Sequence, residues 1–157
     1  MSNDTLSPGD TAPAFSLPRD GGDTLSLSDF AGRALVIFFY PRDDTSGCTK
    51  EAVAFTGLLD AFEAAGAAVL GVSKDTVAKH EKFVQKHGLG MPLLSDADGD
   101  MCETYGTWKE KSMYGKTYMG IERTTFLIGN DGKIARIWHK VKVPGHAEEV
   151  LEALKSL

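Results

Sequence analysis

The strongest restriction on the fold of this chain is a continuous apolar run, Ala34–Tyr40, which Pro41 ends. Such a run suits a central strand covered on both faces, because a strand with one wet face would alternate apolar and polar residues. Residues 67–72 form a second run of the same kind and predict a second buried strand.

The segment between these two strands has a helical period. From about Gly47 to Ala65, apolar side chains recur at steps of four and three residues, which places them on one face of a helix. Gly66 is positioned to end that helix. The apolar face comprises Cys48, Ala52, Phe55, Leu59 and Phe62.

The remaining patterns complete an α/β chain with strands and helices in alternation, then a hairpin and a last helix. They predict a hairpin around Asp20-Gly21-Gly22, helices at residues 76–87, 98–105 and 146–157, and strands at residues 92–95, 124–128 and 133–139. This order predicts one domain over residues 1–157. A thioredoxin-like α/β/α sandwich with a central mixed β-sheet and an N-terminal β-hairpin has the same order of elements.

Composition narrows the functional classes. The net charge of −5 argues against nucleic acid or an anionic membrane as the main partner. Residues 1–11 lack the basic and apolar regions of a secretory signal, and the longest apolar run is too short to span a bilayer. Two cysteines are too few for a disulfide framework. We therefore expect a cytoplasmic, thiol-reducing environment, in which a catalytic cysteine is more plausible than a disulfide-bonded one.

Cys48 falls in the first turn of the predicted helix, directly after a buried strand and a short loop. Unpaired backbone N–H groups and the helix dipole favour an anion at that position, and the thiolate is the nucleophilic form of cysteine. Thr45 can turn its hydroxyl toward the sulfur or a bound oxygen, and Pro41 can shield one side of the pocket. A cysteine at a helix start is nevertheless more often a buried small apolar side chain than a nucleophile.

The wider context of Cys48 resembles a known family. Pro41, Thr45 and Cys48 match Pro-x-x-x-Thr-x-x-Cys, the active-site signature of the peroxiredoxins. Residues 39–52, FYPRDDTSGCTKEA, are similar to the bacterioferritin-comigratory-protein (peroxiredoxin Q) branch, as are residues 9–18, 92–96 and 121–128. The resemblance thus extends over nearly the whole chain.

The resemblance implies a thiol-dependent peroxidase that acts in antioxidant defence. Cys48 would attack hydrogen peroxide or an organic hydroperoxide, release water or an alcohol and become a sulfenic acid, without a metal or organic cofactor. Arg123 would be its positive partner, although an arginine there could also be a solvated charge at an edge strand. Thioredoxin, glutaredoxin or a small thiol would be the reductant, and the branch suggests a monomer or weak dimer. Glu51, one turn after Cys48, would oppose the thiolate if it pointed at the sulfur.

The chain departs from this family at the resolving cysteine. Relatives place it at positions that hold Val53 or Val84 here, so Cys102 is the only internal candidate. A disulfide needs Cα atoms within about 7 Å, so a Cys48–Cys102 bond would require local unfolding. Cys102 is therefore either a resolving or a buried structural cysteine, and an external thiol is slightly favoured.

Rival functions lack their motifs. No Cys-x-x-Cys follows Cys48, as a disulfide reductase would require, and no arginine follows closely, as a cysteine-dependent phosphatase would require. The four histidines have no metal-ligand spacing and suit surface or satisfied structural positions. A non-peroxidatic thioredoxin-fold redox sensor or binding module remains the alternative, since fold does not fix function.

Overall fold

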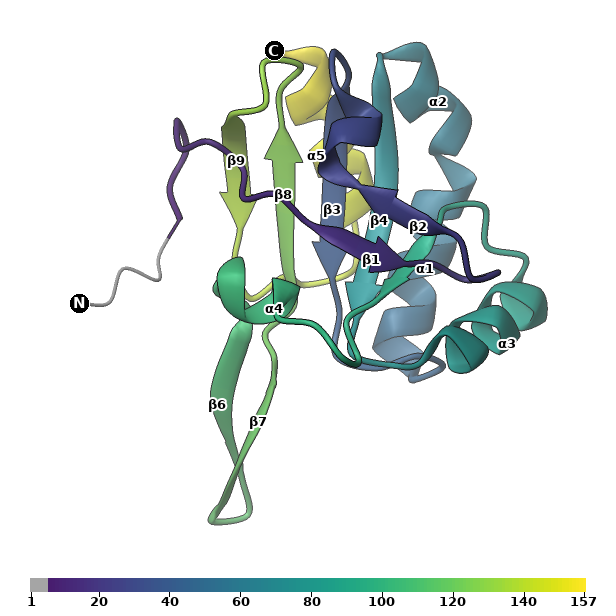
Figure 1. Cartoon of the computed structure of the whole chain (residues 1–157), viewed down its shortest axis with the longest axis vertical. Coiled ribbons are helices and arrows are strands. Elements are labelled where there is room, and N and C mark those ends of the chain that lie inside the picture. Colours follow the sequence, from purple (N-terminus) through teal and green to yellow (C-terminus); the bar gives the residue numbers. More distant parts are fainter. Residues whose placement is uncertain (1–5) are drawn as a thin grey trace.

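The centre of the structure is a five-stranded mixed sheet in the order β5-β4-β3-β8-β9 (Figure 1). β3, β4 and β5 are parallel, whereas β8 runs antiparallel to β3 and β9 antiparallel to β8. The strands are β3 (Ala34–Phe39), β4 (Ala67–Ser73), β5 (Leu93–Ser95), β8 (Thr124–Ile128) and β9 (Ile134–Trp138). Both predicted apolar runs are therefore central strands, and β3 is buried at every position.

A computed structural model describes residues 6–157. Residues 1–5 lie outside the described part, and they belong to the segment 1–11 that lacks the features of a secretory signal. Within it, none of the helices has the length and apolar character needed to cross a membrane.

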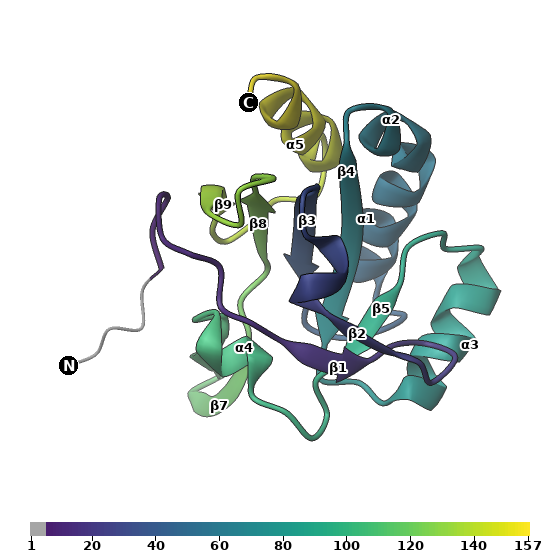
Figure 2. The ribbon, with the colours of Figure 1, turned by 45° about the horizontal axis from the view of Figure 1, so that its top comes forward.

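Two apolar cores cover the two faces of the sheet. Figure 2 shows the elements that lie on either side of it. Even-numbered residues of β3, such as Val36 and Phe38, face the first core, and odd-numbered residues, such as Ile37 and Phe39, face the second. The first core is covered by α1 (Ser46–Gly57), α2 (Leu59–Ala64), α3 (Val77–His87) and α5 (His146–Lys155). The second is covered by β1 (Ser16–Pro18), β2 (Thr24–Ser26), the 3₁₀ helix η1 (Leu27–Phe30) and α4 (Met101–Thr104). The predicted sandwich and its N-terminal hairpin are confirmed.

The helix predicted over residues 47–65 is interrupted. α1 ends at Gly57, and α2 begins at Leu59 after Leu58 leaves helical geometry with φ −110° and ψ 6°. Gly57, a weak helix former, precedes the break. Phe55 and Phe62 still lie in the same core, so the interruption preserves the apolar face that the periodicity indicated.

Other predicted boundaries hold to within a few residues. The Thr76 hydroxyl accepts the N–H of Lys79 and caps α3, while Gly88 ends that helix in the left-handed conformation. Leu17 pairs with Leu25 in the N-terminal hairpin. The helix predicted at residues 98–105 is real but shorter, because it begins only at Met101.

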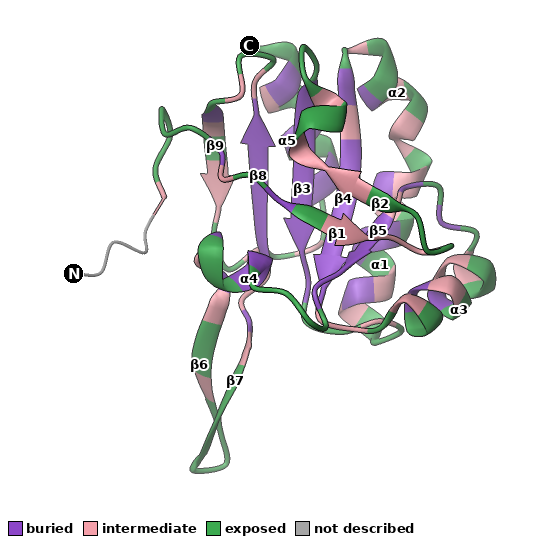
Figure 3. Ribbon diagram, viewed as in Figure 1, coloured by how far each residue is buried: buried purple, intermediate pink, exposed green. Residues whose placement is uncertain are grey.

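One hairpin has no counterpart in the prediction. β6 (Trp108–Met113) and β7 (Lys116–Ile121) form an arm that projects from the body of the molecule and is largely exposed (Figure 3). Its turn residues, Tyr114 and Gly115, both have positive φ, as in the tight turns that join right-twisted strands. The arm ends at buried Ile121, two residues before Arg123.

Candidate active site

Cys48 is the third residue of α1 and lies in its first turn. The Thr49 N–H already donates to the Thr45 carbonyl over 2.8 Å, while the amides that precede it point out of the helix end. β3 delivers the chain to this point through an exposed loop, so the site lies at the carboxyl end of a buried strand. Cys48 itself is only 1% exposed.

Arg123 reaches Cys48 from the segment between β7 and β8. Its Nη2 lies 3.4 Å from the Cys48 Sγ, although the two residues are 75 positions apart. Gly47 permits this approach, because a Cβ there would lie 3.2 Å from the same Nη2. The contact places the permanent positive charge of the guanidinium beside the sulfur. The arginine suggested by the resemblance therefore contacts the sulfur.

Glu51 holds the other side of the guanidinium. Arg123 Nη1 donates to Glu51 Oε1 over 2.7 Å, and Glu51 is 1% exposed with its Oε2 unpartnered in the described structure. Burial raises the pKa of Glu51 to about 7, and Arg123 only partly opposes that rise. Partial burial lowers the pKa of Arg123, but Glu51 and Cys48 raise it overall, so the guanidinium stays charged. Glu51 therefore binds the arginine, a role that the sequence reading did not assign to it.

Thr45 and Pro41 lie in the loop before the helix. The Thr45 hydroxyl donates to the Arg42 carbonyl over 3.1 Å, so its proton is directed at the loop and not at the sulfur. Both residues are exposed at the approach to Cys48.

The loop is fixed to the body through Asp43. Its carboxylate accepts a hydrogen bond from the Tyr40 hydroxyl over 2.6 Å, and its Oδ2 lies 2.7 Å from Nδ1 of His80 on α3. His80 Nε2 faces the Leu94 carbonyl over 2.8 Å and must donate to it, because a carbonyl oxygen only accepts. His80 is fully buried with both ring nitrogens engaged, as a satisfied structural histidine should be.

The neighbouring Asp44 adds a second attachment to α3. It has a φ of 61°, forms an ion pair with Lys86 at 2.8 Å and lies within hydrogen-bond distance of His87 Nε2 at 2.9 Å. The loop and α3 are thus joined at two successive residues. The sequence gives no signal for these contacts, since the paired residues lie 37 to 43 positions apart.

Among residues 6–157, one group has the donor types and closeness to hold a metal ion, namely Asp43, Asp75 and His80. Hydrogen bonds already occupy these side chains: Asp75 Oδ2 accepts from the Asp43 N–H at 2.8 Å and from the Ser73 hydroxyl at 2.7 Å. The cluster serves as the anchor of the loop.

Cys102 lies in α4, in the core on the opposite face of the sheet from Cys48. It is fully buried, and burial together with the Asp96 carboxylate raises the pKa of its thiol. Both cysteines are free. The sheet therefore separates the candidate nucleophile from the only candidate internal resolving residue.

A thioredoxin-like sheet with a cysteine in the first turn of α1 and an arginine on its sulfur defines the class of cysteine-dependent peroxidases. Residues 8–137 match the model of the AhpC/TSA family. The chain belongs to that family, in its peroxiredoxin Q or Bcp branch, and is a thiol-dependent peroxidase.

Curated relatives and solved structures are similar to this chain over most of its length. It is 51% identical over 146 residues to a putative peroxiredoxin Bcp of Coxiella burnetii, covering 93% of this chain and 97% of the relative. It is 49% identical over 147 residues to peroxiredoxin Bcp of Xanthomonas campestris, with 92% of each covered. A mutant peroxiredoxin Q of Xylella fastidiosa has a TM-score of 0.92 at 44% identity, over 98% of both chains. Trapped intermediate and ligand complexes of X. campestris bacterioferritin comigratory protein, described for its alkyl peroxide reduction activity, have a TM-score of 0.86 at 48% identity, over 90% of both chains.

Proposed function

We propose that Cys48 is the peroxidatic nucleophile and that the substrates are hydrogen peroxide and organic hydroperoxides. The Cys48 thiolate attacks the terminal peroxide oxygen, the S–O bond forms as the O–O bond breaks, and the leaving oxyanion takes a proton to become water or an alcohol. Cys48 is left as a sulfenic acid. The alkyl peroxide activity described for the X. campestris relative supports the organic substrates.

The observation that carries this proposal is the 3.4 Å contact between Arg123 Nη2 and the Cys48 Sγ. Arg123 supplies a fixed positive charge where negative charge spreads over the breaking O–O bond. The unpaired amides at the start of α1 act in the same direction. Thr45, at the head of the helix, is proposed to turn its hydroxyl to the bound peroxide, and Pro41 to shield the pocket from the loop side.

We further propose that an external thiol recycles the sulfenic acid. Val53 and Val84 occupy the usual resolving positions, and Cys102 is buried across the sheet. Thioredoxin, glutaredoxin or a small thiol would then be the reductant. We propose a monomer or weak dimer that works in a reducing compartment such as the cytoplasm, where its two free cysteines stay reduced and it removes peroxides as part of antioxidant defence.

The nucleophile is tested by Cys48→Ser with Cys102→Ser as the matched control. One equivalent of peroxide should produce a dimedone-trapped sulfenic acid in the control protein and none in Cys48→Ser. Peroxide consumption with dithiothreitol should fall to the uncatalysed rate only in Cys48→Ser. Normal consumption by Cys48→Ser would refute the assignment. A trapped sulfenic acid in the wild type without turnover by any thiol would favour the redox-sensor alternative.

A further inference from the structure

The β6–β7 arm concentrates exposed apolar surface on one element. Six large apolar side chains are exposed in the described residues, and four of them lie on the arm: Met113, Tyr114, Tyr118 and Met119. Tyr114, at the tip, is 97% exposed. Such a concentration on a projecting element marks an interaction surface, because scattered single exposures are the ordinary case.

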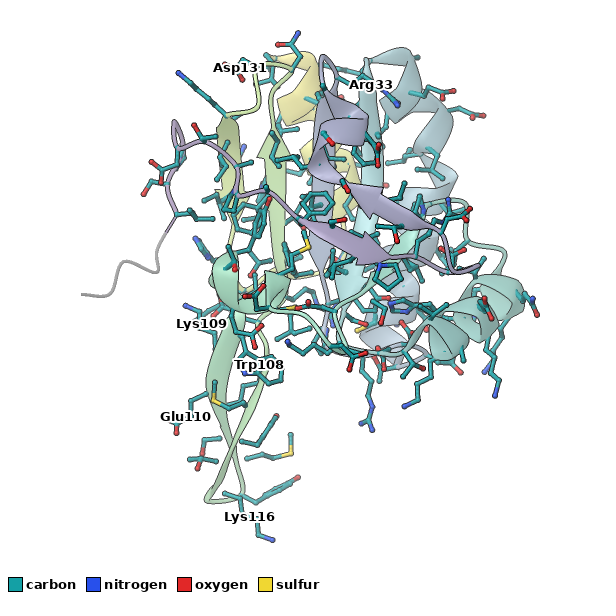
Figure 4. All side chains as sticks on the ribbon, viewed as in Figure 1. Arg33, Trp108, Lys109, Glu110, Lys116 and Asp131 are labelled. Carbon is teal, nitrogen blue, oxygen red and sulfur yellow. The ribbon has the colours of Figure 1, made fainter. Side chains whose placement is uncertain are left out.

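The strand register sorts the arm into two different faces. Residues directly opposite one another in an antiparallel pair share a face. Lys109 pairs with Gly120, Lys111 with Tyr118, and Met113 with Lys116, so one face holds three lysines, a tyrosine and a methionine. We call it the lysine face. The arm carries three lysines against one glutamate, a net charge of +2, although the whole chain has a net charge of −5. Figure 4 shows Lys109 near the base of the arm and Lys116 at its tip.

The base of the lysine face adjoins the active site. The Lys111 side chain lies against Gly120, where a Cβ would be 3.3 Å from the Lys111 Cδ, and the arm ends two residues before Arg123. Partial burial and then the Arg123 charge lower the pKa of Lys111, while Cys48 acts in the opposite direction. A molecule that binds the base of the lysine face therefore lies close to Arg123, whose guanidinium contacts the Cys48 sulfur.

We propose that the lysine face is the docking surface for a dithiol protein reductant of the thioredoxin type, with an acidic and apolar surface around its reactive thiol. This inference rests on the proposed recycling by an external thiol. A small thiol needs no extended platform, whereas a protein must align its thiolate with Cys48, a residue that is only 1% exposed. A permanent occupant, such as a second copy, would leave no room beside Arg123 and Cys48 for the external reductant that the proposed recycling requires. The position beside Cys48 therefore favours a transient partner.

The chemistry of the docked state balances. The first reductant thiolate attacks the Cys48 sulfur, an S–S bond forms, and the S–O bond breaks to release hydroxide, which takes a proton to become water. The second reductant thiol then attacks the mixed disulfide at the reductant's own sulfur. Cys48 leaves as a thiolate, and the two thiols have supplied two electrons by becoming a disulfide.

The test uses the charge reversals Lys109→Glu and Lys116→Glu together. The matched control is Lys133→Glu with Lys155→Glu, in which Lys133 is two residues from Asp131, at the opposite end of the molecule from the arm (Figure 4). The probe is thioredoxin with its reductase and NADPH. We expect the arm variant to raise the KM for thioredoxin about tenfold. The control should not, and the wild-type KM should rise with salt more steeply than that of the arm variant.

Two readouts separate this inference from the function on which it rests. Oxidation by one equivalent of peroxide and turnover with dithiothreitol should be the same in all three proteins. If dithiothreitol supports no turnover in the wild type, the proposed function fails. If it does, an equal KM for thioredoxin in the arm variant and the control overturns the docking surface. Failure of thioredoxin and glutaredoxin alike to support turnover overturns it as well. A stable dimer that only the arm variant dissociates, as measured by light scattering, would assign the face to a second copy instead.

Discussion

Cys48 and Cys102 are both buried near the start of a helix, yet opposite charges lie beside their sulfur atoms. At α4 the Asp96 carboxylate already accepts the N–H groups of Met101 and Cys102, at 3.1 and 2.8 Å, and so places a negative charge beside the sulfur. At α1 an arginine lies against the sulfur instead. The position at a helix start is thus the same for both cysteines, and the neighbouring charge is what distinguishes them.

Removing the Arg123 guanidinium should have the largest effect, because it removes the charge that distinguishes Cys48 from Cys102. Arg123→Ala should slow oxidation of Cys48 by one equivalent of peroxide about 100-fold, because it removes a preorganised donor from the developing charge. Arg123→Lys should fall between that variant and the wild type, since a point charge does not reproduce the guanidinium fork. The measurement is stopped-flow oxidation, with Arg136→Ala as the control arginine. An unchanged rate in Arg123→Ala would remove the supposed basis of the difference between the two cysteines.

The Glu51 carboxylate, which binds Arg123, should change how the free energy of unfolding depends on pH. The pKa of Glu51 is raised to about 7, so its contribution to stability is complete below about pH 4.5 and is lost as the pH rises through 7. Relative to the wild type, Glu51→Gln should therefore gain up to about 3 kcal/mol of unfolding free energy between pH 5 and pH 8. Denaturant unfolding at the two pH values measures this gain, and exposed Glu148→Gln is the control.

His146 changes the free energy of unfolding over a similar pH range, but in the opposite direction. Burial lowers its pKa to about 4, so its contribution to stability is present above about pH 6.5 and is lost as the pH falls through 4. The comparison of Glu51→Gln with the wild type cancels this background. If the difference between the two proteins does not change with pH, Glu51 is ionised throughout and does not titrate as inferred.

A smaller effect is expected when the space around the Arg123 guanidinium is narrowed. Gly47→Ala places a methyl group 3.2 Å from Arg123 Nη2, so the guanidinium must shift and peroxide oxidation should slow about tenfold. Gly57→Ala is the matched control in the same helix, because its Cβ meets nothing within 4 Å. The control should keep its oxidation rate, and equal rates in both variants would show that the close approach of Arg123 is dispensable.

The smallest effect on turnover is expected from the other cysteine. Cys102→Ala should leave peroxide turnover with thioredoxin or dithiothreitol unchanged, while the small cavity lowers stability by about 1 kcal/mol. Steady-state assays and denaturant unfolding measure the two effects. Rapid formation of a Cys48–Cys102 cross-link in the wild type, together with faster over-oxidation of the variant, would contradict this expectation and make Cys102 a resolving cysteine.

Much of the fold can be predicted from the sequence, because buried positions produce apolar residues at the period of a strand or a helix. The apolar runs of β3 and β4 and the face of α1 were predictable, since the two strands are covered on both faces and the helix packs against the sheet. The arm has no such period, because most of both strands projects from the body and polar and apolar residues are mixed along them. The break in the helix at Leu58 could not be predicted either, because the apolar period continues across it.

The candidate site divides in the same way. Cys48 and Arg123 are suggested by motifs that resemble a family, whereas the role of Glu51 depends on which way its carboxylate points in a buried space. The opposite-face position of Cys102 depends on how α4 packs on the sheet. Such relations arise only when distant segments meet, and no local pattern encodes them.

The attachment of the loop to α3 couples the segment that precedes Cys48 to a separate helix. Because Asp43 and Asp44 tie the loop to His80, Lys86 and His87, unwinding α3 would also dismantle the entrance to Cys48. The proposed recycling by an external thiol requires no such unwinding, so under that proposal Cys48 is ready for the next peroxide once its thiolate is restored. The same readiness is a liability when reductant runs short. A sulfenic acid that waits in an intact pocket meets the next peroxide there and is oxidised to the dead-end sulfinic acid.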